Sequence, residues 1–305
     1  MRDLLYVPPG RKPATGLIGV LVPELANPIF PALAQAIETR AAPDGLASIL
    51  CNTREAAYRE IDYVHMLLDR RVEGMIFISC EMTNLTADHS HYARLLDEGA
   101  RFVFVNGALH QLDVPSVGVD ERAAGEIATQ HLLDLGHERI GFVAGPEHYQ
   151  PTQMKAAGRA EVMRAAGIDP DGMTAHAEFS VAGGRQALAE LLSQRDRPTG
   201  VICSSDVMAI GALHEAAQHG IKVPDQLSIV GFDGIDAGTW SVPMLTTVEQ
   251  PIAQIADTAV QTLATLIEDP SGRLPNSYFR PRLRERGSTA PPARAQRKPN
   301  TAAVA

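Results

Sequence analysis

The chain has 305 residues, of which 45% are hydrophobic and 21% charged, and its net charge is −9 at pH 7. This length suffices for two α/β domains with full cores, and the composition is ordinary for a globular protein. No apolar run approaches the ~18 residues of a membrane span, and the first residues lack the apolar stretch of a secretory signal. We therefore expect a cytoplasmic protein that makes no membrane contact.

Charge is distributed unevenly along the chain. Residues 280–305 carry seven basic side chains and one acidic one, and basic side chains also outnumber acidic ones in residues 1–16. The body between these ends is therefore more acidic than the whole chain, and such a surface repels nucleic-acid phosphates. Three cysteines lie far apart in the sequence, which favours free thiols in a reducing compartment.

Strand and helix patterns alternate along the chain. Nearly continuous apolar runs predict buried strands at 17–22, 47–51, 74–78, 101–105, 116–119, 139–144, 200–203 and 227–232. Apolar residues at helical spacing predict helices at 28–41, 55–70, 121–135, 153–166, 181–194, 207–220 and 252–268, with Asn27 and Ser180 as two of the N-caps. Repeated units of this kind predict parallel α/β sheets, and the number of strands suits two Rossmann-like lobes.

Two carboxylates follow strands of the second half of the chain. Asp206 comes shortly after the strand at 200–203, and Asp233 follows the strand at 227–232. Ligands of parallel α/β sheets bind beyond the carboxyl ends of the strands, so both side chains are expected at a binding edge. The alternatives are an N-cap or structural-turn role for Asp206 and a turn role for Asp233, which precedes Gly234.

No coherent catalytic set is found. The phosphate-binding and dinucleotide-binding glycine motifs are absent from the sequence. Ser204, Ser205 and His214 could be imagined as nucleophile and base, but His214 is expected to face solvent from a helix. His89 and His91 could be a metal pair, but they lie in a polar stretch without a nearby third ligand, so we expect two exposed histidines. Catalytic residues, metals and cofactors are therefore not predicted.

Three closely spaced motifs lie between Thr199 and Pro251: S-S-D-V-M-A-I-G-A-L, G-I-K-V-P-D-Q-L-S-I-V-G-F-D and P-M-L-T-T-V-E-Q-P. Together they resemble the effector-binding core of the lactose-repressor (LacI/GalR) family of bacterial transcription regulators. The resemblance implies a type I periplasmic-binding-protein-like fold, in which two lobes joined by three crossovers bind a small polar metabolite between them. It also implies a homodimer in which lobe closure changes the spacing of attached DNA-binding headpieces.

The resemblance also suggests domain boundaries. We expect a short remnant or linker at 1–16, an N-terminal lobe at 17–119 plus 251–275, a C-terminal lobe at 120–250 plus 276–287, and a disordered tail at 288–305. Sixteen residues are too few for the three-helix DNA-binding headpiece of the family. Either the true start lies upstream or the gene has lost its DNA reader, and operator DNA is an expected partner only in the first case.

Several polar residues match effector-binding positions of the family. Asp233 would accept hydrogen bonds from paired ligand hydroxyls. Lys155 stands where the family has an arginine, and it offers a point charge for a carboxylate, phosphate or hydroxyl; an ordinary surface lysine is the alternative. Asn106 stands where the family often has Asp, and Ser205 where it often has Asn.

The remaining candidates are aromatic or lie at expected crossovers. Phe30 would lie against the ligand, and Phe179 and Trp240 could stack on a sugar face, although each is as readily a core residue. Asp120 and Gln250 fall at crossovers, and the family uses the equivalent of Gln250 for an effector contact. The predicted effector-binding residues are Phe30, Asn106, Asp120, Lys155, Phe179, Ser205, Asp206, Asp233, Trp240 and Gln250.

The resemblance and the residues together predict the effector-sensing core of a LacI-type regulator. Its small-molecule effector would be a sugar or sugar acid, and effector binding would control DNA binding. The alternative is a stand-alone cytoplasmic sugar-binding protein that never touches DNA. A third hypothesis, an α/β enzyme, lacks a catalytic set in the sequence.

Overall fold

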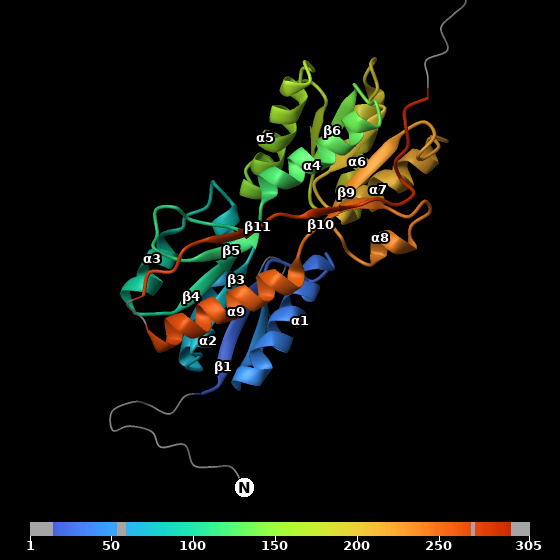
Figure 1. Cartoon of the computed structure of the whole chain (residues 1–305). Helices are drawn as coiled ribbons and strands as arrows, with labels where there is room; N and C mark the ends of the chain where they lie inside the picture. The colour runs from blue at the N-terminus through green and yellow to red at the C-terminus, as the bar shows by residue number, and fades with distance from the viewer. Residues whose placement is uncertain (1–14, 54–58, 270–271, 294–305) are drawn as a thin grey trace, which may run out of the picture. The chain divides into compact units, whose positions relative to one another are not determined.

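A computed structural model of the chain describes residues 15–53, 59–269 and 272–293, which form two compact units (Figure 1). Unit 1 comprises the described residues of Met1–Ala123, His148–Met154 and Gln250–Pro281. Unit 2 comprises those of Ala124–Glu147, Lys155–Glu249 and Arg282–Ala305. Two helices, α4 (Glu121–Asp134) and α5 (Gln150–Ala165), contain residues of both units.

Unit 1 is built on a six-stranded sheet with the order β11-β5-β4-β3-β1-β2, whose neighbouring strands all run parallel. Its strands are β1 (Leu17–Val22), β2 (Ala47–Asn52), β3 (Gly74–Ile78), β4 (Phe102–Val105), β5 (Ser116–Val119) and β11 (Ser277–Phe279). Its helices are α1 (Ile29–Ala41), α2 (Glu60–Asp69), α3 (Ser90–Asp97) and α9 (Ile252–Glu268), with short 3-10 turns η1 (Ala42–Asp44) and η2 (Glu81–Thr83).

Unit 2 repeats this plan with the strand order β12-β10-β9-β8-β6-β7. Its strands are β6 (Ile140–Ala144), β7 (Thr174–His176), β8 (Gly200–Cys203), β9 (Ser228–Asp233), β10 (Thr246–Glu249) and β12 (Arg282–Arg284). Its further helices are α6 (Val181–Ser193), α7 (Asp206–Gln218) and the short α8 (Ala237–Trp240). Only the β10–β12 pair of this sheet is antiparallel.

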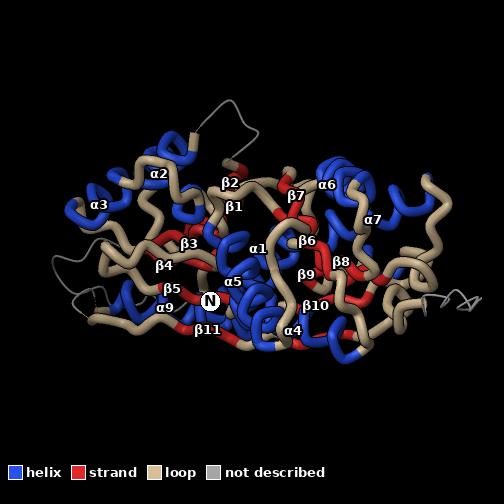
Figure 2. Tube along the Cα trace, turned by 90° about the horizontal axis from the view of Figure 1, so that it is seen from above, coloured by secondary structure: helices blue, strands red, loops and turns tan. Residues whose placement is uncertain are grey.

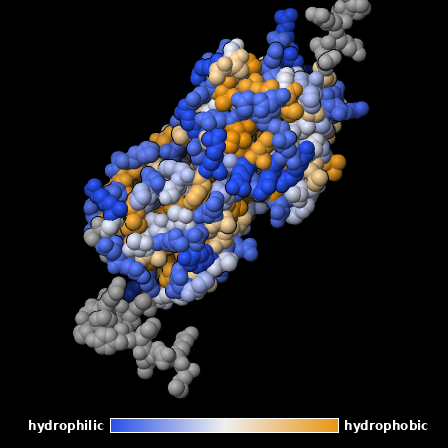
Figure 3. Space-filling model, in the orientation of Figure 1, coloured by the Kyte–Doolittle hydropathy of each residue, from blue (hydrophilic) through white to orange (hydrophobic). Residues whose placement is uncertain are grey.

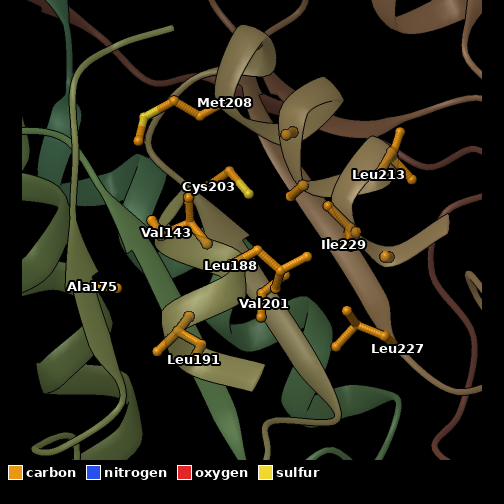
Figure 4. Packing of buried hydrophobic residues seen from close by; sticks show 14 of the residues in the cluster. Val143, Ala175, Leu188, Leu191, Val201, Cys203, Met208, Leu213, Leu227 and Ile229 are labelled. Carbon is orange, nitrogen blue, oxygen red and sulfur yellow. The ribbon is translucent and has the colours of Figure 1, made fainter. Parts of the chain in front are cut away.

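Burial on both faces explains the apolar strands. Every residue of β3, β4, β6 and β8 is buried, because helices cover both sides of each sheet (Figure 2). In unit 2, α6 and α7 pack together over one face, where Leu188, Val201 and Ile229 belong to one buried cluster (Figure 4). The expected α/β fold with two Rossmann-like lobes and parallel sheets is therefore confirmed, except for the antiparallel edge strand β12.

Helix starts differ from the sequence-based expectations by a few residues. The first helix begins at Ile29 with Pro28 at the N-cap position, although Asn27 Oδ1 still accepts the Ile29 N–H at 3.3 Å. The second helix begins at Glu60 because Arg59 is extended and its N–H donates to the Asp62 carboxylate. Residues 54–58 of that prediction lie outside the described residues.

The polar stretch around His89 is not the expected loop. Helix α3 begins at Ser90, and Asp88 accepts hydrogen bonds from the Ser90 N–H and hydroxyl at 2.9 Å each. The helix turns His91 and Tyr92 into the core of unit 1, so the expectation that His91 is exposed is wrong. The sequence did not predict this helix, because the segment is mostly polar and only a few of its residues are buried.

The chain also divides differently from the expected lobe boundaries. Residues 276–281 belong to unit 1, because β11 pairs in parallel with β5. The segment His148–Met154 packs with unit 1 as well, where Leu85 N–H donates to His148 O at 2.9 Å and Tyr149 bridges to Asn84. Non-local backbone pairing decides both assignments, and periodicity along the sequence does not record it.

Residues 288–293 are not a disordered tail. Ser288 is fully buried in unit 2, where its Oγ accepts the Thr246 N–H at 2.8 Å and donates to Ile229 O at 2.6 Å. Ala290 N–H donates to Ser228 Oγ at 3.0 Å. The expected remnant at 1–14 and the tail at 294–305 lie outside the described residues.

The described helices include none that is both long and apolar enough to span a bilayer. On the face shown in Figure 3, hydrophilic side chains predominate and hydrophobic ones are scattered among them. Scattered apolar residues of this kind are normal on protein surfaces.

Candidate functional site

In unit 2, Asp206 connects the ends of β8 and β9 with the neighbouring strand β10. It follows β8, and its side chain is fully buried. One carboxylate oxygen, Oδ2, accepts the N–H groups of Gly234 and Ile235 beyond β9, at 2.8 and 2.9 Å. The other, Oδ1, accepts the Thr247 hydroxyl of β10 at 2.6 Å. Both oxygens therefore bind protein donors, and Asp206 positions the turn that follows Asp233.

Burial sets the charge state of Asp206. It raises the pKa of the carboxyl to about 6, although the hydrogen bonds from Thr247, Ile235 and Gly234 and the charge of Arg286 lower it. Removal from water disfavours the ionised carboxylate more than these four groups restore it. Sequence reasoning overlooked Thr247, because a threonine within a strand carries no signal for this contact.

Ser205 is the N-cap of α7. Its Oγ accepts the Met208 N–H at 3.3 Å, and its side chain is buried. The N-cap role that was considered for Asp206 is thus performed by Ser205, the residue before it. Ser204 is also buried, and its Oγ accepts the Gly145 N–H at the end of β6 at 3.2 Å.

Asp233 ends β9 in a conformation that side chains rarely adopt. Its φ is +128°, whereas most residues other than glycine have negative φ. Such strain is typically held by its surroundings at ligand-binding positions. Here the hydrogen bonds from the following turn to Asp206 hold the backbone in place. Asp233 itself is 4% exposed.

Lys155 lies at the same edge of the unit 2 sheet. Its Nζ is 3.8 Å from the ring centroid of Phe232, the neighbour of Asp233, and the residue is only 4% exposed. An ammonium over an aromatic face is favourable, more so when water is excluded. The alternative of a surface lysine is therefore wrong. Helix α4 approaches closely at Gly125, where a Cβ would lie 2.1 Å from Lys155 O.

The two aromatic candidates of unit 2 have different surroundings. The ring of Phe179 lies on Gly145, where a Cβ would be 2.1 Å from Phe179 Cζ, and it packs against the buried cluster of this unit. Trp240 ends α8 and is 78% exposed, close in sequence to Val242 at 95% and Met244 at 52%. Trp240 is therefore a surface residue and not part of the core.

Unit 1 brings two predicted site residues into direct contact. Asn106 follows β4 with a φ of +54°, and its Nδ2 donates to Gln250 Oε1 at 2.9 Å. Its Oδ1 accepts the Val119 N–H at 3.0 Å. Both Asn106 and Gln250 are buried. They form a rigid polar pair at the carboxyl edge of the unit 1 sheet, although 144 positions separate them in the sequence.

The other two candidates of unit 1 have local structural roles. Asp120 Oδ1 accepts the Ala123 N–H at 2.9 Å and so caps α4, while Asp120 N–H donates to Phe279 O at the end of β11. Phe30 is half-buried in the first turn of α1, where its N–H donates to Asn27 O at 3.2 Å.

The chemistry of the two edges is that of binding. The edge of unit 2 combines carboxylate, ammonium and hydroxyl groups with aromatic rings, and the edge of unit 1 carries two amide side chains. Each of these sets contains groups that suit a polyhydroxylated ligand. Asp233 and Lys155 stand out in unit 2, and Asn106 and Gln250 in unit 1. His214 lies about two turns after Ser205, on the exposed face of α7, where it hydrogen-bonds to Gln218. The serine–histidine pair considered from the sequence therefore does not form.

Comparisons with known proteins agree with this architecture. The family model of the periplasmic binding protein-like domain matches residues 129–289. The chain is 40% identical over 284 residues to an HTH-type transcriptional regulator of the aml 5′ region of Streptomyces limosus, covering 92% of this chain and 80% of that protein. It is 38% identical over 289 residues to the HTH-type transcriptional regulator MalR of Streptomyces coelicolor, covering 92% and 82%.

A solved structure is similar over nearly the whole fold. A LacI family transcriptional regulator from Enterococcus faecium with bound ribose has a TM-score of 0.80 and 30% identity, covering 90% of this chain and 99% of that one. These relatives are transcriptional regulators, and the chain covers most of their length. The chain therefore belongs to the LacI family of transcriptional regulators, and the two units are its effector-binding core.

Proposed function

We propose that the chain senses a sugar or sugar acid and thereby controls DNA binding by a LacI-type regulator. The observation that carries this proposal is the edge of unit 2. There the buried Lys155 ammonium lies over the Phe232 ring, and the next residue in the chain is Asp233, whose backbone is strained. A buried cation and a carboxylate can bind the hydroxyls of a sugar, and the cation can also pair with a sugar carboxylate. The bound ribose of the Enterococcus relative supports a sugar.

The ten predicted residues take different parts in this proposal. Asp233, Lys155, Asn106 and Gln250 are the proposed polar contacts, with Phe179 and Phe30 as apolar ones. Ser205, Asp206 and Asp120 act indirectly, because their side chains already accept backbone or hydroxyl hydrogen bonds that shape the edges. Trp240 remains a proposed contact, but its 78% exposure suits a protein interface at least as well.

We also propose that the chain forms a homodimer in the cytoplasm, where bacterial transcription is regulated. Trp240, Val242 and Met244 give unit 2 a group of exposed apolar side chains, which is a feature of interfaces. Light scattering coupled to size-exclusion chromatography measures the oligomeric state directly.

A thermal-shift screen over sugars, sugar acids and sugar phosphates tests the effector proposal. The true effector raises the melting temperature of the wild-type chain, because it binds only the folded state. Asp233→Asn keeps the size of the side chain and tolerates positive φ, but it replaces a carboxylate oxygen by a donor, so the shift is expected to vanish. Asp236→Asn, at an exposed aspartate nearby, is the matched control and retains the shift.

The salt dependence of affinity then identifies the effector class. If Lys155 pairs with an anionic effector, affinity falls as salt rises, and Lys155→Gln removes this dependence. A neutral sugar gives an affinity that salt barely changes. An undiminished thermal shift in Asp233→Asn would contradict the assigned site.

A further inference from the structure

A second group of polar side chains lies in unit 1, outside the proposed effector contacts. Glu60 is the first residue of α2, Glu81 the first of η2, and His91 the second of α3. Within the described residues, one ligand-type atom of each lies within 4.8 Å of those of the other two. His91 Nε2 and Glu60 Oε1 are 3.1 Å apart. Three separate elements thus bring a histidine and two carboxylates together.

The Glu60 carboxylate is held in a fixed orientation. It is 1% exposed; its Oε1 accepts the Tyr92 hydroxyl, and its Oε2 accepts the Glu81 N–H at 3.0 Å. The Tyr92 ring is itself fixed by edge contacts with Phe77 and Phe104, at centroid distances of 5.3 and 5.0 Å. Hydrogen bonds of this kind orient ligating carboxylates in metal sites and tune their affinity.

Negative charge is concentrated at this place. A carboxylate oxygen of Glu60 and one of Glu81 lie within 4.8 Å of each other. Two carboxylates so close together repel each other, and a bound cation removes that repulsion. Because Glu81 is exposed while Glu60 and His91 are buried, one side of the group is open to solvent and to an entering ion.

We propose that Glu60, Glu81 and His91 bind a Zn²⁺ ion. One imidazole nitrogen and two carboxylate oxygens belong to the ligand set of zinc, whereas calcium and magnesium prefer oxygen alone. Tetrahedral ligands at bond lengths of about 2.0 Å lie about 3.3 Å apart, close to the 3.1 Å between His91 Nε2 and Glu60 Oε1. The ion replaces that hydrogen bond, and water completes its coordination on the side of Glu81.

The proposed ion links the starts of α2, η2 and α3, so it stabilises unit 1 by binding only the folded state. It also fixes the segment that follows β3. Strand β3 lies next to β4, the strand that Asn106 follows. The proposal is independent of effector binding, since none of the three ligands is a proposed effector contact.

Titration of the full chain with ZnCl₂ alone, after treatment with EDTA and dialysis, tests the proposal. Calorimetry is expected to show one ion per chain, and the melting temperature to rise with zinc. Glu81→Gln removes one ligand at an exposed position, so the fold is kept while zinc affinity falls at least about tenfold. His65→Ala, at an exposed histidine of the same α2 helix, is the matched control and binds zinc like the wild type.

Cobalt gives a readout of the ligand set itself. Co²⁺ in the wild-type chain is expected to show the visible absorption of a low-coordinate site, and Glu81→Gln and His91→Gln are expected to change or abolish it. If His91→Gln does not fold, the comparison of the Co²⁺ spectra of Glu81→Gln and the wild type tests the ligand set. The proposal is wrong if the wild type binds no stoichiometric zinc, if Glu81→Gln binds it unchanged, or if His65→Ala loses it equally.

Discussion

At the edge of unit 2, one aspartate is proposed to contact the ligand and another supports the backbone around it. Asp233 is the strained, ligand-facing candidate, and Asp206 is the buried carboxylate that holds its turn. The two look equivalent in the sequence, since each follows a strand. Their roles separate only because two backbone N–H groups and the Thr247 hydroxyl converge on Asp206.

The Asp206 carboxyl predicts a particular pH dependence of stability. Its pKa of about 6 in the folded chain exceeds the value of about 3.9 for an unfolded aspartate. The folded state therefore binds the proton more tightly, and the contribution of this group to the free energy of unfolding falls as pH rises from about 4 to about 6. Asp206→Asn can still accept the two N–H groups with its amide oxygen, while its NH2 group donates to the Thr247 hydroxyl instead of accepting from it. This variant is expected to lose the pH slope. Asp206→Ala leaves buried N–H groups unpaired and is expected to cost about 3 kcal/mol at pH 7, and more at pH 5, where the contribution of the wild-type carboxyl is larger.

Urea unfolding followed by circular dichroism at pH 5 and pH 7 measures both effects. Comparing Asp206→Asn with Asp206→Ala separates the effect of the carboxylate charge on the free energy of unfolding from the effect of its hydrogen bonds. Equal destabilisation by the two variants at pH 7 would show that the carboxylate charge itself is needed.

At the scale of elements, the contact between α4 and α5 positions Lys155. A side chain at Gly125 would meet the Lys155 carbonyl at 2.1 Å, so only glycine allows this approach. Gly125→Ala must push α5 away, which moves the ammonium off the Phe232 ring. We expect a loss of roughly 1–3 kcal/mol in stability, as for other overpacked contacts, together with weaker effector binding.

Gln130→Ala, at an exposed position of the same helix α4, is the control and changes neither property. Melting curves give the stability, and the effector-induced thermal shift gives the binding. A variant Gly125→Ala with full stability would mean that the two helices separate without cost, and the close approach would then have no role in placing Lys155.

At the scale of the whole molecule, the last described segment completes unit 2. The chain leaves unit 1 after β11, pairs as β12 antiparallel to β10, and then buries Ser288 between β9 and β10. A chain that ends at Gly287 loses these hydrogen bonds and exposes the buried N–H of Thr246. Its unit 2 is expected to melt several degrees lower, because the three hydrogen bonds of Ser288 and Ala290 contribute about 1 kcal/mol each.

A chain that ends at Ala293 keeps every contact described for this segment and is the matched control. Calorimetric melting of the two truncated chains measures the difference. Equal melting temperatures would contradict a structural role for residues 288–293.

Much of the fold could be predicted from the sequence, because strands buried on both faces must be apolar throughout. The strands at 17–22, 74–78, 116–119 and 200–203 have the predicted bounds. Helix α3 and strand β11 were missed because each is short and gains its stability from non-local partners. The placement of Asp206 and Asp233 at one sheet edge also followed from the strand pattern.

By itself, the amino-acid sequence determined the two-lobed α/β class, the family and the chemical types at each strand end, since these depend on local pattern and motif. Only the tertiary structure decided which of these groups form hydrogen bonds with other parts of the protein. Asn106 meets Gln250 across 144 positions, Asp206 is saturated by protein donors, and His91 turns inward to Glu60. Such contacts depend on how distant segments pack, and no local spacing in the chain encodes that packing.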